Sequence, residues 1–257
     1  MMNFHIITLF PESFSSYLNE SILKRAQKEK KIKFHFYNPR DFAKPTKSQK
    51  KNEKPYLRVD DKPYGGGAGM VLQAEPILKA FSKVEKKIRT SPPTPLLKTG
   101  EGKKREKIKV VIFSAKGKFF NQKMAYDWAK KYKEIVFITG RYEGIDERVK
   151  QALKAEEISI GPYVLTDGDV AAMVVSSAVA RLVPGVIRLE SLKEESYWRL
   201  LLKKEKRGEI GENGLEYPHY TRPKVFEYKG KKYRVPKILL LGNHAKITEW
   251  RSKNKKA

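Results

Sequence analysis

The segment 140–149, Gly-Arg-Tyr-Glu-Gly-Ile-Asp-Glu-Arg-Val, concentrates two arginines, a tyrosine and three acids in ten residues. It directly follows the apolar run Glu134–Thr139, whose β-branched and aromatic residues predict a short buried strand ended by a glycine. Ligands of open α/β sheets bind at the carboxyl ends of the strands. This mixture of charge and aromatic rings therefore indicates a site for a charged cofactor and a polar base rather than an ordinary surface loop.

A second candidate is the segment 159–169, Ser-Ile-Gly-Pro-Tyr-Val-Leu-Thr-Asp-Gly-Asp, which leaves a predicted strand and enters an apolar helix. Its backbone could cup an adenine or a ribose. An ordinary strand-to-helix connection explains the segment equally well.

The loop Asp60–Met70 holds four glycines within five residues, at 65, 66, 67 and 69. Glycine permits positive φ and a close approach of the backbone to a ligand. The run lacks the Lys-Ser/Thr pair of a P-loop and the spacing of a dinucleotide fingerprint, which excludes a nucleoside triphosphate site. A plain flexible loop is the alternative reading.

Arg181 and the pair Glu194-Glu195 carry little information by themselves. An arginine near the end of a helix often only complements the helix dipole, and two acids in a linker are commonly solvated. His219 and His244 lie in polar segments of a chain with four histidines and no cysteine, which argues against zinc and favours contacts to RNA or helix capping. His5 lies in a predicted core strand and is expected to be satisfied there.

The net charge of +26, from 55 Lys and Arg against 29 Asp and Glu, indicates a polyanionic partner. The excess is concentrated in the blocks 44–58, 83–109 and 246–257. Solvated basic faces are the alternative, but blocks of this kind suit a phosphate footprint, so we favour nucleic acid.

Secretion and membrane insertion are not expected. The chain has no cysteine, no apolar run near the roughly 18 residues of a membrane span, and an amino terminus without a basic leader region. The sequence thus predicts a cytoplasmic protein.

Strands alternate with helices, which predicts an α/β domain with a mainly parallel sheet over residues 1–187. The predicted strands are 3–10, 31–37, 109–114 and 134–139, and 158–165 is predicted as a strand followed by a turn. The predicted helices are 12–29 (with Ile22, Leu23 and Ala26 facing inward), 73–84, 122–131, 145–153 and 169–182. We interpret 38–69 as a long loop, 85–107 as a flexible insertion, 188–212 as an interdomain linker and 213–257 as a small second domain.

Taken in order, the motifs resemble one family: the bacterial tRNA (guanine-N1)-methyltransferases of the knotted SPOUT methyltransferase superfamily. The matching segments cover nearly the whole chain: 10–12, 39–42, 60–70, 140–149, 159–165, 181–185, 218–223 and 242–251. The resemblance implies an α/β domain with a deep trefoil knot, a small helical C-terminal domain that binds tRNA, and a homodimer. It also implies that S-adenosylmethionine is the methyl donor and that guanosine 37 of tRNA, just 3′ of the anticodon, is the acceptor. The reaction would depend on magnesium, for which the resemblance assigns no ligand residues.

The resemblance also assigns roles residue by residue. Glu195 would be the base that removes the N1 proton, reaching the cofactor of the other subunit, with Glu194 as fallback. Arg181 would stabilise charge on the guanine O6, and Glu143 would orient the site or magnesium. The cofactor would contact Ser114, Gly140, Tyr142, Ile160, Gly161, Pro162, Tyr163, Val164 and Leu165. The tRNA would contact Asp60, Gly66, Gly67, Gly69, Ser191, His219 and Arg222.

The sequence departs from the family pattern at several places. Glu195 replaces an aspartate, Ser177 stands where an aspartate is usual, and Pro162 replaces a common acid. The C-terminal domain is expected to be shorter than usual, and the basic insertions 44–55 and 85–107 are expected to compensate with charge.

Two other functions compete with this reading. One is a SPOUT methyltransferase that acts on another RNA, such as a ribosomal RNA ribose, although an acid at 195 favours a guanine base. The other is a non-catalytic RNA-binding protein, which would differ in failing to bind S-adenosylmethionine.

Overall fold

The computed structural model describes residues 1–45, 57–90, 108–195 and 217–254. The chain separates into two units, residues 1–187 and 188–257. Parts of four predicted segments lie outside the described residues: 46–56 of the long loop, 91–107 of the insertion, 196–212 of the linker, and 213–216 and 255–257 of the second domain.

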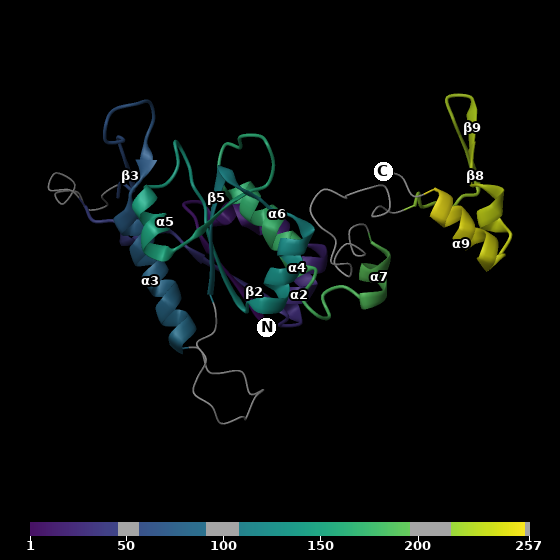
Figure 1. Cartoon of the computed structure of the whole chain (residues 1–257), viewed down its shortest axis with the longest axis horizontal. Coiled ribbons are helices and arrows are strands. Elements are labelled where there is room, and N and C mark those ends of the chain that lie inside the picture. The colour runs from purple at the N-terminus through teal and green to yellow at the C-terminus, as the bar shows by residue number, and fades with distance from the viewer. Residues whose placement is uncertain (46–56, 91–107, 196–216, 255–257) are drawn as a thin grey trace, which may run out of the picture. The chain divides into compact units, whose positions relative to one another are not determined.

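A five-stranded parallel sheet forms the centre of the first unit (Figure 1). Its order is β2-β1-β6-β5-β7, so the most apolar strand, β6, lies in the middle. The strands are β1 (Met2–Ile7), β2 (Ile32–Tyr37), β5 (Ile108–Phe119), β6 (Glu134–Ile138) and β7 (Glu156–Ser159). The predicted parallel α/β sheet is therefore confirmed.

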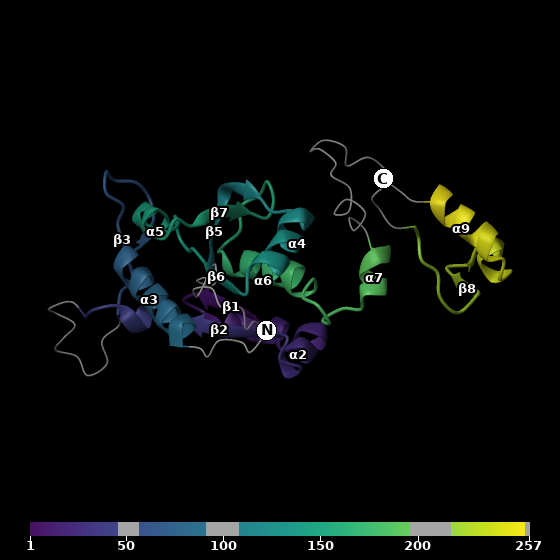
Figure 2. The same ribbon diagram turned by 60° about the horizontal axis from the view of Figure 1, so that its bottom comes forward.

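Helices cover both faces of this sheet (Figure 2). One face carries α1 (Ser15–Leu18), α2 (Ser21–Lys28), α4 (Gln122–Lys131) and α6 (Asp169–Ala180); the other carries α3 (Ala74–Thr90) and α5 (Glu147–Leu153). Alternate side chains of a strand point to opposite faces. Ile135 and Phe137 of β6 accordingly pack with α4 and α6, and Val136 and Ile138 pack with α3.

Short elements complete the first unit. They are the 3-10 helices η1 (Pro11–Phe14) and η2 (Pro39–Phe42) and the antiparallel pair β3 (Asp60–Asp61) and β4 (Val71–Leu72). The segment 38–69, predicted as loop throughout, thus contains a helical turn and a short strand.

The second unit contains a hairpin as well as helices. Its described elements are α7 (Leu189–Glu194), β8 (Val225–Tyr228), β9 (Lys231–Arg234), η5 (Lys237–Leu240) and α9 (His244–Lys253). The side chain of Asn243 caps α9 by accepting a hydrogen bond from the Lys246 amide at 3.1 Å.

The prediction of one helix over 12–29 is wrong. The chain instead forms η1, α1 and α2, with a break before Ser21, whose φ is +48°. The break resets the helical register. Leu23 and Ala26 remain buried as predicted, but Ile22 is 40% exposed.

Three other boundaries also differ. Residues 85–90 of the predicted insertion form the last turns of α3, whose Ile88 still packs against the core. The predicted linker contains α7. The segment 158–165, predicted as a strand followed by a turn, contains the end of β7, which begins earlier, at Glu156, and ends at Ser159.

His5 is satisfied in the core, as predicted. Its Nε2 lies 2.8 Å from Glu134 Oε2 and its Nδ1 lies 3.1 Å from the Tyr37 hydroxyl, with His5 only 1% exposed. Burial raises the pKa of Tyr37 to about 12. The ring of His5 also stacks on His35, whose Nδ1 lies 3.0 Å from Lys87 Nζ.

His35 is expected to make the stability of the fold depend on pH. Burial, with Lys87, His5 and Lys33 nearby, lowers its pKa from 6.5 to about 4. The unfolded chain therefore binds a proton between these values that the folded chain excludes, so stability is lost as the pH falls from 6.5 towards 4. Urea unfolding should show a loss of about 1–3 kcal/mol over this window. His35→Gln should lose less, and an unchanged profile would contradict the assignment.

Candidate active site

A cavity of ≈ 430 Å³ opens at the carboxyl ends of β5, β6 and β7. Its walls come from the segments 112–116, 140–147, 157–160 and 163–168, with Lys150 and Ala171. Its volume lies within the range of about 300–1,000 Å³ that is typical of small-molecule sites. The cavity thus occupies the edge of the sheet that the sequence indicated.

An irregularity in β5 contributes the first wall. The pairing of β5 with β7 is interrupted between Phe113 and Lys118, each of which pairs with Ile158. Residues 114–116 lie in this interruption and line the cavity. The chain returns through Gly117, where a Cβ atom would lie 2.6 Å from the Ile158 amide nitrogen. Only glycine fits this approach, so Gly117 allows Ser114 to face the cavity.

The loop after β6 is held by the glycine-rich loop 60–70. The Glu143 amide donates a hydrogen bond to the Met70 carbonyl at 3.0 Å. Just beyond, the Leu72 amide donates to the Gly144 carbonyl and the Leu72 carbonyl accepts from the Asp146 amide. Gly69, with a φ of +77°, lies so close that a Cβ atom there would be 2.5 Å from Glu143 Oε1. The glycine-rich loop therefore supports the site, and the alternative of a plain flexible loop does not hold at its C-terminal end.

Two glycines bring the third wall against the second. The Gly168 amide donates to the Gly140 carbonyl at 2.9 Å, and a Cβ atom on Gly168 would lie 3.0 Å from the Gly140 nitrogen. The segment after β7 thus returns past the end of β5 to the end of β6 before α6 begins.

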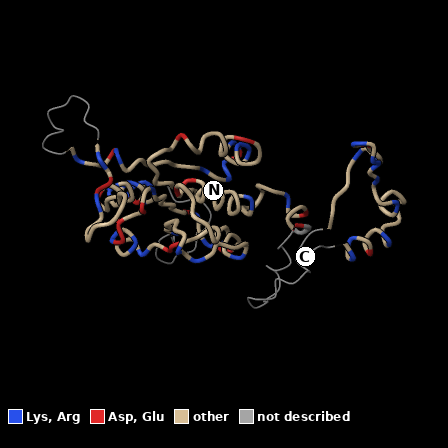
Figure 3. Tube along the Cα trace, turned by 90° about the horizontal axis from the view of Figure 1, so that it is seen from above, with Lys and Arg blue, Asp and Glu red and all other residues tan. Residues whose placement is uncertain are grey.

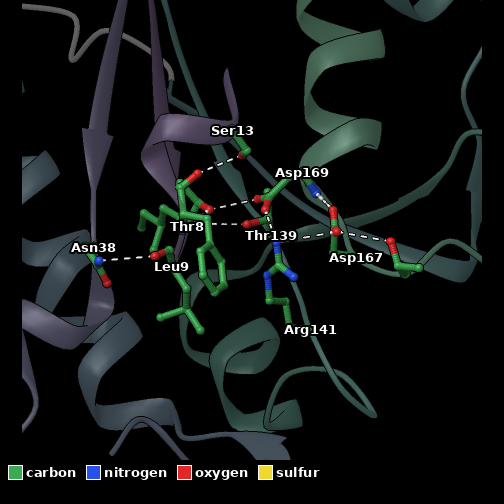
Figure 4. A network of polar contacts seen from close by, with 11 residues as sticks. Thr8, Leu9, Ser13, Asn38, Thr139, Arg141, Asp167 and Asp169 are labelled. Carbon is green, nitrogen blue, oxygen red and sulfur yellow. Dashed lines mark hydrogen bonds and ion pairs between the residues drawn. The ribbon is translucent and has the colours of Figure 1, made fainter. Parts of the chain in front are cut away.

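Arg141 joins these loops to the end of β1 (Figure 4). Its Nη2 lies 2.9 Å from Asp169 Oδ2 and 3.4 Å from Asp167 Oδ2, and its guanidinium lies 4.1 Å from the centre of the Phe10 ring. The Thr8 hydroxyl donates to the other oxygen of Asp169 at 2.8 Å. Asp169 is only 2% exposed, so its charge is compensated almost entirely by these partners.

The rim of the cavity carries a second charge cluster. Lys150 lies 2.6 Å from Glu157 and 3.1 Å from Glu147, and Lys116 approaches the same two acids within 3.7 Å. The hydrogen bond from Lys150 lowers the pKa of Glu147, and hydrogen bonds to Glu157 and Glu147 raise the pKa of Lys150. Two lysines and two acids are thereby paired at the cavity wall.

The structure brings most of the predicted cofactor residues together. Those that line the cavity are Ser114, Gly140, Tyr142, Ile160, Tyr163, Val164 and Leu165, together with the predicted catalytic residue Glu143. Gly161 and Pro162 belong to the same loop but do not line the cavity. Asp60 lies on β3, and Gly66, Gly67 and Gly69 lie on the loop that follows it.

The other predicted residues lie outside the cavity. Arg181 is the C-terminal cap of α6. Ser191 on α7, Glu195 at its C-terminal cap, His219 and Arg222 all belong to the second unit.

The sequence did not identify the partners that orient Arg141. Arg141 was part of the informative segment 140–149, but its pairing with Asp167 and Asp169 joins residues 26 and 28 positions apart. An acid at the first position of an otherwise apolar helix was the available signal for Asp169. Thr8 had no signal of its own, and Phe10 was singled out only as part of the segment 10–12 of the family resemblance.

Two features are absent from the described part of the chain. No helix there is long and apolar enough to span a bilayer. No cluster of three or more His, Cys, Asp or Glu side chains suited to a metal occurs among the same residues.

Comparison with known proteins identifies the family. A family model described as tRNA (Guanine-1)-methyltransferase TrmD matches residues 2–257. A tRNA (guanine-N(1)-)-methyltransferase of Carboxydothermus hydrogenoformans is 44% identical over 98% of this chain and 82% of its own length. Relatives of the same description from Clostridioides difficile and Chloroflexus aggregans are 42% and 44% identical, each over 97% of this chain and over 90% and 81% of their own lengths. Similarity of this extent, together with the cavity in its expected place, shows that the chain belongs to the tRNA (guanine-1)-methyltransferase family.

Proposed function

We propose that this protein transfers the methyl group of S-adenosylmethionine to N1 of guanosine 37 in tRNA, in the cytoplasm. Family membership over residues 2–257 is the observation that carries the proposal. The cavity supports it as well, because its walls contain seven of the nine residues that the family resemblance assigns to the cofactor.

The residues of the cavity fit S-adenosylmethionine. Ile160, Val164 and Leu165 offer apolar surface for an adenine. Gly140 and Gly168, which lie in close contact, present backbone rather than side chains to the cavity. Arg141 Nε is buried and, within the described residues, has no hydrogen-bond partner, which leaves a donor for a polar group of the ligand. When bound, the cofactor supplies an electrophilic methyl group on a positively charged sulfur.

The protein's own residues must solve a proton problem. Neutral guanine N1 is a poor nucleophile until its proton leaves, and a carboxylate within hydrogen-bond reach can accept that proton. We assign this role to Glu195. Arg181 would stabilise the negative charge that develops on the guanine O6, and Glu143, fixed by Met70 and Gly69 at the cavity wall, would orient the site.

A homodimer is part of the proposal. Val170 and Val174, one turn apart on α6, are 44% and 45% exposed, and Tyr17 beside them donates a hydrogen bond to Ser177 of the same helix at 2.7 Å. An exposed apolar helix face of this kind suits a partner surface. A second copy would also let Glu195 serve the cavity of the other subunit.

The trefoil knot and magnesium also remain proposals. The return of the chain from the outer strand β7 to Gly140 at the end of β6 supports a knotted path. Magnesium commonly binds through one or two carboxylates and oxygens of the substrate. Glu143 could therefore contribute to such a site without a preformed protein cluster.

Methyl transfer to defined tRNAs tests the function. The purified protein is incubated with labelled S-adenosylmethionine, magnesium and a tRNA carrying guanosine at 37 preceded by guanosine. The same tRNA with adenosine at 37 is the matched control. We expect label only with guanosine 37, recovered as 1-methylguanosine. Label in both tRNAs would place the acceptor elsewhere, and label in neither would contradict the proposal.

Gly69→Ala is expected to impair methyl transfer more than it impairs folding. A side chain at this position adopts an unfavourable φ and displaces Glu143, which lies within 2.5 Å of the added Cβ atom. Gly65→Ala is the matched control, because its φ of +84° is equally unfavourable but its Cβ atom would contact nothing within 4 Å. Both variants should lose roughly 1 kcal/mol of stability. Only Gly69→Ala should lower kcat, and equal rates in the two variants would count against a role for Glu143.

A further inference from the structure

The hairpin of β8 and β9 exposes three aromatic rings on one of its faces. Cross-strand pairing sets Phe226 opposite Tyr233 and Tyr228 opposite Lys231. Side chains two residues apart lie on the same side of a strand, so the three rings share one face. Phe226, Tyr228 and Tyr233 are 54%, 59% and 42% exposed, which is unusual for apolar rings placed side by side.

The hairpin geometry holds these rings in fixed positions. Lys229 and Gly230 have φ values of +49° and +72°, which match the two-residue turns that favour tight hairpins. The Val235 amide donates to the Lys224 carbonyl at 3.0 Å and closes the base of the hairpin. The Phe226 and Tyr233 rings stack with their centres 5.3 Å apart and their planes 14° from parallel. Little conformational entropy is therefore lost when a flat ligand binds.

Positive charge surrounds the rings. Residues 224–234 contain five Lys and Arg against one Glu, and 217–254 contain ten against two (Figure 3). Lys229 Nζ lies 5.5 Å from the centre of the Tyr228 ring, and Lys231 Nζ lies 5.7 Å from that of Tyr233. A second copy of this hairpin would repel the first. A polyanion with flat, apolar rings complements it in both charge and shape.

We propose that this hairpin face binds unpaired bases of tRNA, with the aromatic rings stacking on bases and the neighbouring lysines contacting phosphates. Exposed aromatic side chains on a β-sheet surface are a general means of stacking single-stranded bases. Paired stems expose no free base faces, so the contact is to an unpaired segment, a loop or the single-stranded 3′ end. The inference rests on the proposed function for its RNA, and it adds a binding site outside the catalytic cavity.

Binding of an unmodified tRNA transcript to the full chain, measured across a range of salt concentrations, tests this site. Phe226→Ile with Tyr233→Ile removes the stacked rings. Isoleucine is β-branched and favours strands as aromatic residues do, so the hairpin should be retained. We expect the Kd for tRNA to rise at least about tenfold, with the salt dependence unchanged. Lys229→Gln with Lys231→Gln should instead reduce the slope of log K against log salt by about 1–2.

Two controls separate stacking from loss of structure. Phe226→Tyr with Tyr233→Phe exchanges the two rings and should bind tRNA like the wild type. Ultraviolet cross-linking of the wild type should join RNA to the peptide 225–234. Wild-type affinity in the isoleucine variant, or no cross-link to this peptide, would overturn the inference.

Failure of the proposed function would look different. A wild-type protein that methylates no tRNA, while the isoleucine variant still loses RNA affinity, would refute the activity and support the hairpin site. If the wild type methylates guanosine 37 and the isoleucine variant equals it in both affinity and rate, the proposed function is supported and the hairpin site is refuted.

Discussion

Glu195→Gln is expected to reduce methyl transfer by about 10²–10⁴-fold, the usual contribution of a positioned general base. The amide keeps the size and much of the hydrogen bonding of the carboxylate but cannot accept the N1 proton. Binding of S-adenosylmethionine and of tRNA should stay within about twofold of the wild type, because the variant removes only the proton acceptor. Single-turnover rates with labelled cofactor, together with calorimetric titration of the cofactor, measure both quantities.

Two further variants test whether the position or the charge is decisive. Glu195→Asp keeps the charge and shortens the reach by one methylene. It should remain far more active than Glu195→Gln, since its carboxylate can still accept the N1 proton. Glu194→Ala should be nearly as active as the wild type. A large loss in Glu194→Ala, with normal rates in Glu195→Gln, would move the base to Glu194.

The location of the site followed from the sequence because it depends on local patterns. The apolar run Glu134–Thr139 followed by a glycine predicts a strand end, and strand ends of parallel sheets bind ligands. Gly140 and Tyr142 therefore had to lie at the carboxyl edge of the sheet, and both line the cavity. For the segment after Ser159 the sequence alone left a ligand contact and an ordinary strand-to-helix connection equally open, and in the structure this segment lines the cavity.

Other features could not be predicted because they depend on contacts between distant residues. The interruption in β5 requires the fit of Gly117 against Ile158, and nothing in the lysine-rich segment 115–118 indicates a strand. The break before Ser21 depends on the positive φ of that residue, a backbone conformation that residues other than glycine rarely adopt. The hairpin 225–234 has a sequence signal, since aromatic residues alternate with polar ones around Lys229-Gly230. The high content of basic residues in this segment is equally typical of a solvated basic face, which has no strand.

Arg141→Met is expected to lower the free energy of unfolding of the first unit by about 3–5 kcal/mol, as is typical when one partner of a buried ion pair is removed. Asp169 is only 2% exposed, so methionine at 141 would leave its carboxylate buried beside Asp167 with the Thr8 hydroxyl as its remaining side-chain donor. Cofactor affinity should fall as well, because Arg141 lines the cavity and ties the loops on either side of it.

A matched series isolates the burial of the pair from its charge. Asp169→Asn should cost less than Arg141→Met, since an amide oxygen still accepts the bond from Thr8 and Arg141 keeps Asp167 as an ion-pair partner. The double variant should be more stable than Arg141→Met alone, because removing the second charge relieves the first loss. Lys123→Met breaks an ion pair with Asp127 in which the lysine is 78% exposed, and it should cost less than about 1 kcal/mol. Urea unfolding of all four variants measures these differences. Equal stability of Arg141→Met and Lys123→Met would contradict a structural role for Arg141 and leave it as a ligand-binding residue only. The loop after β6 and the segment before α6 would then be held together by the backbone hydrogen bond from Gly168 to Gly140 instead.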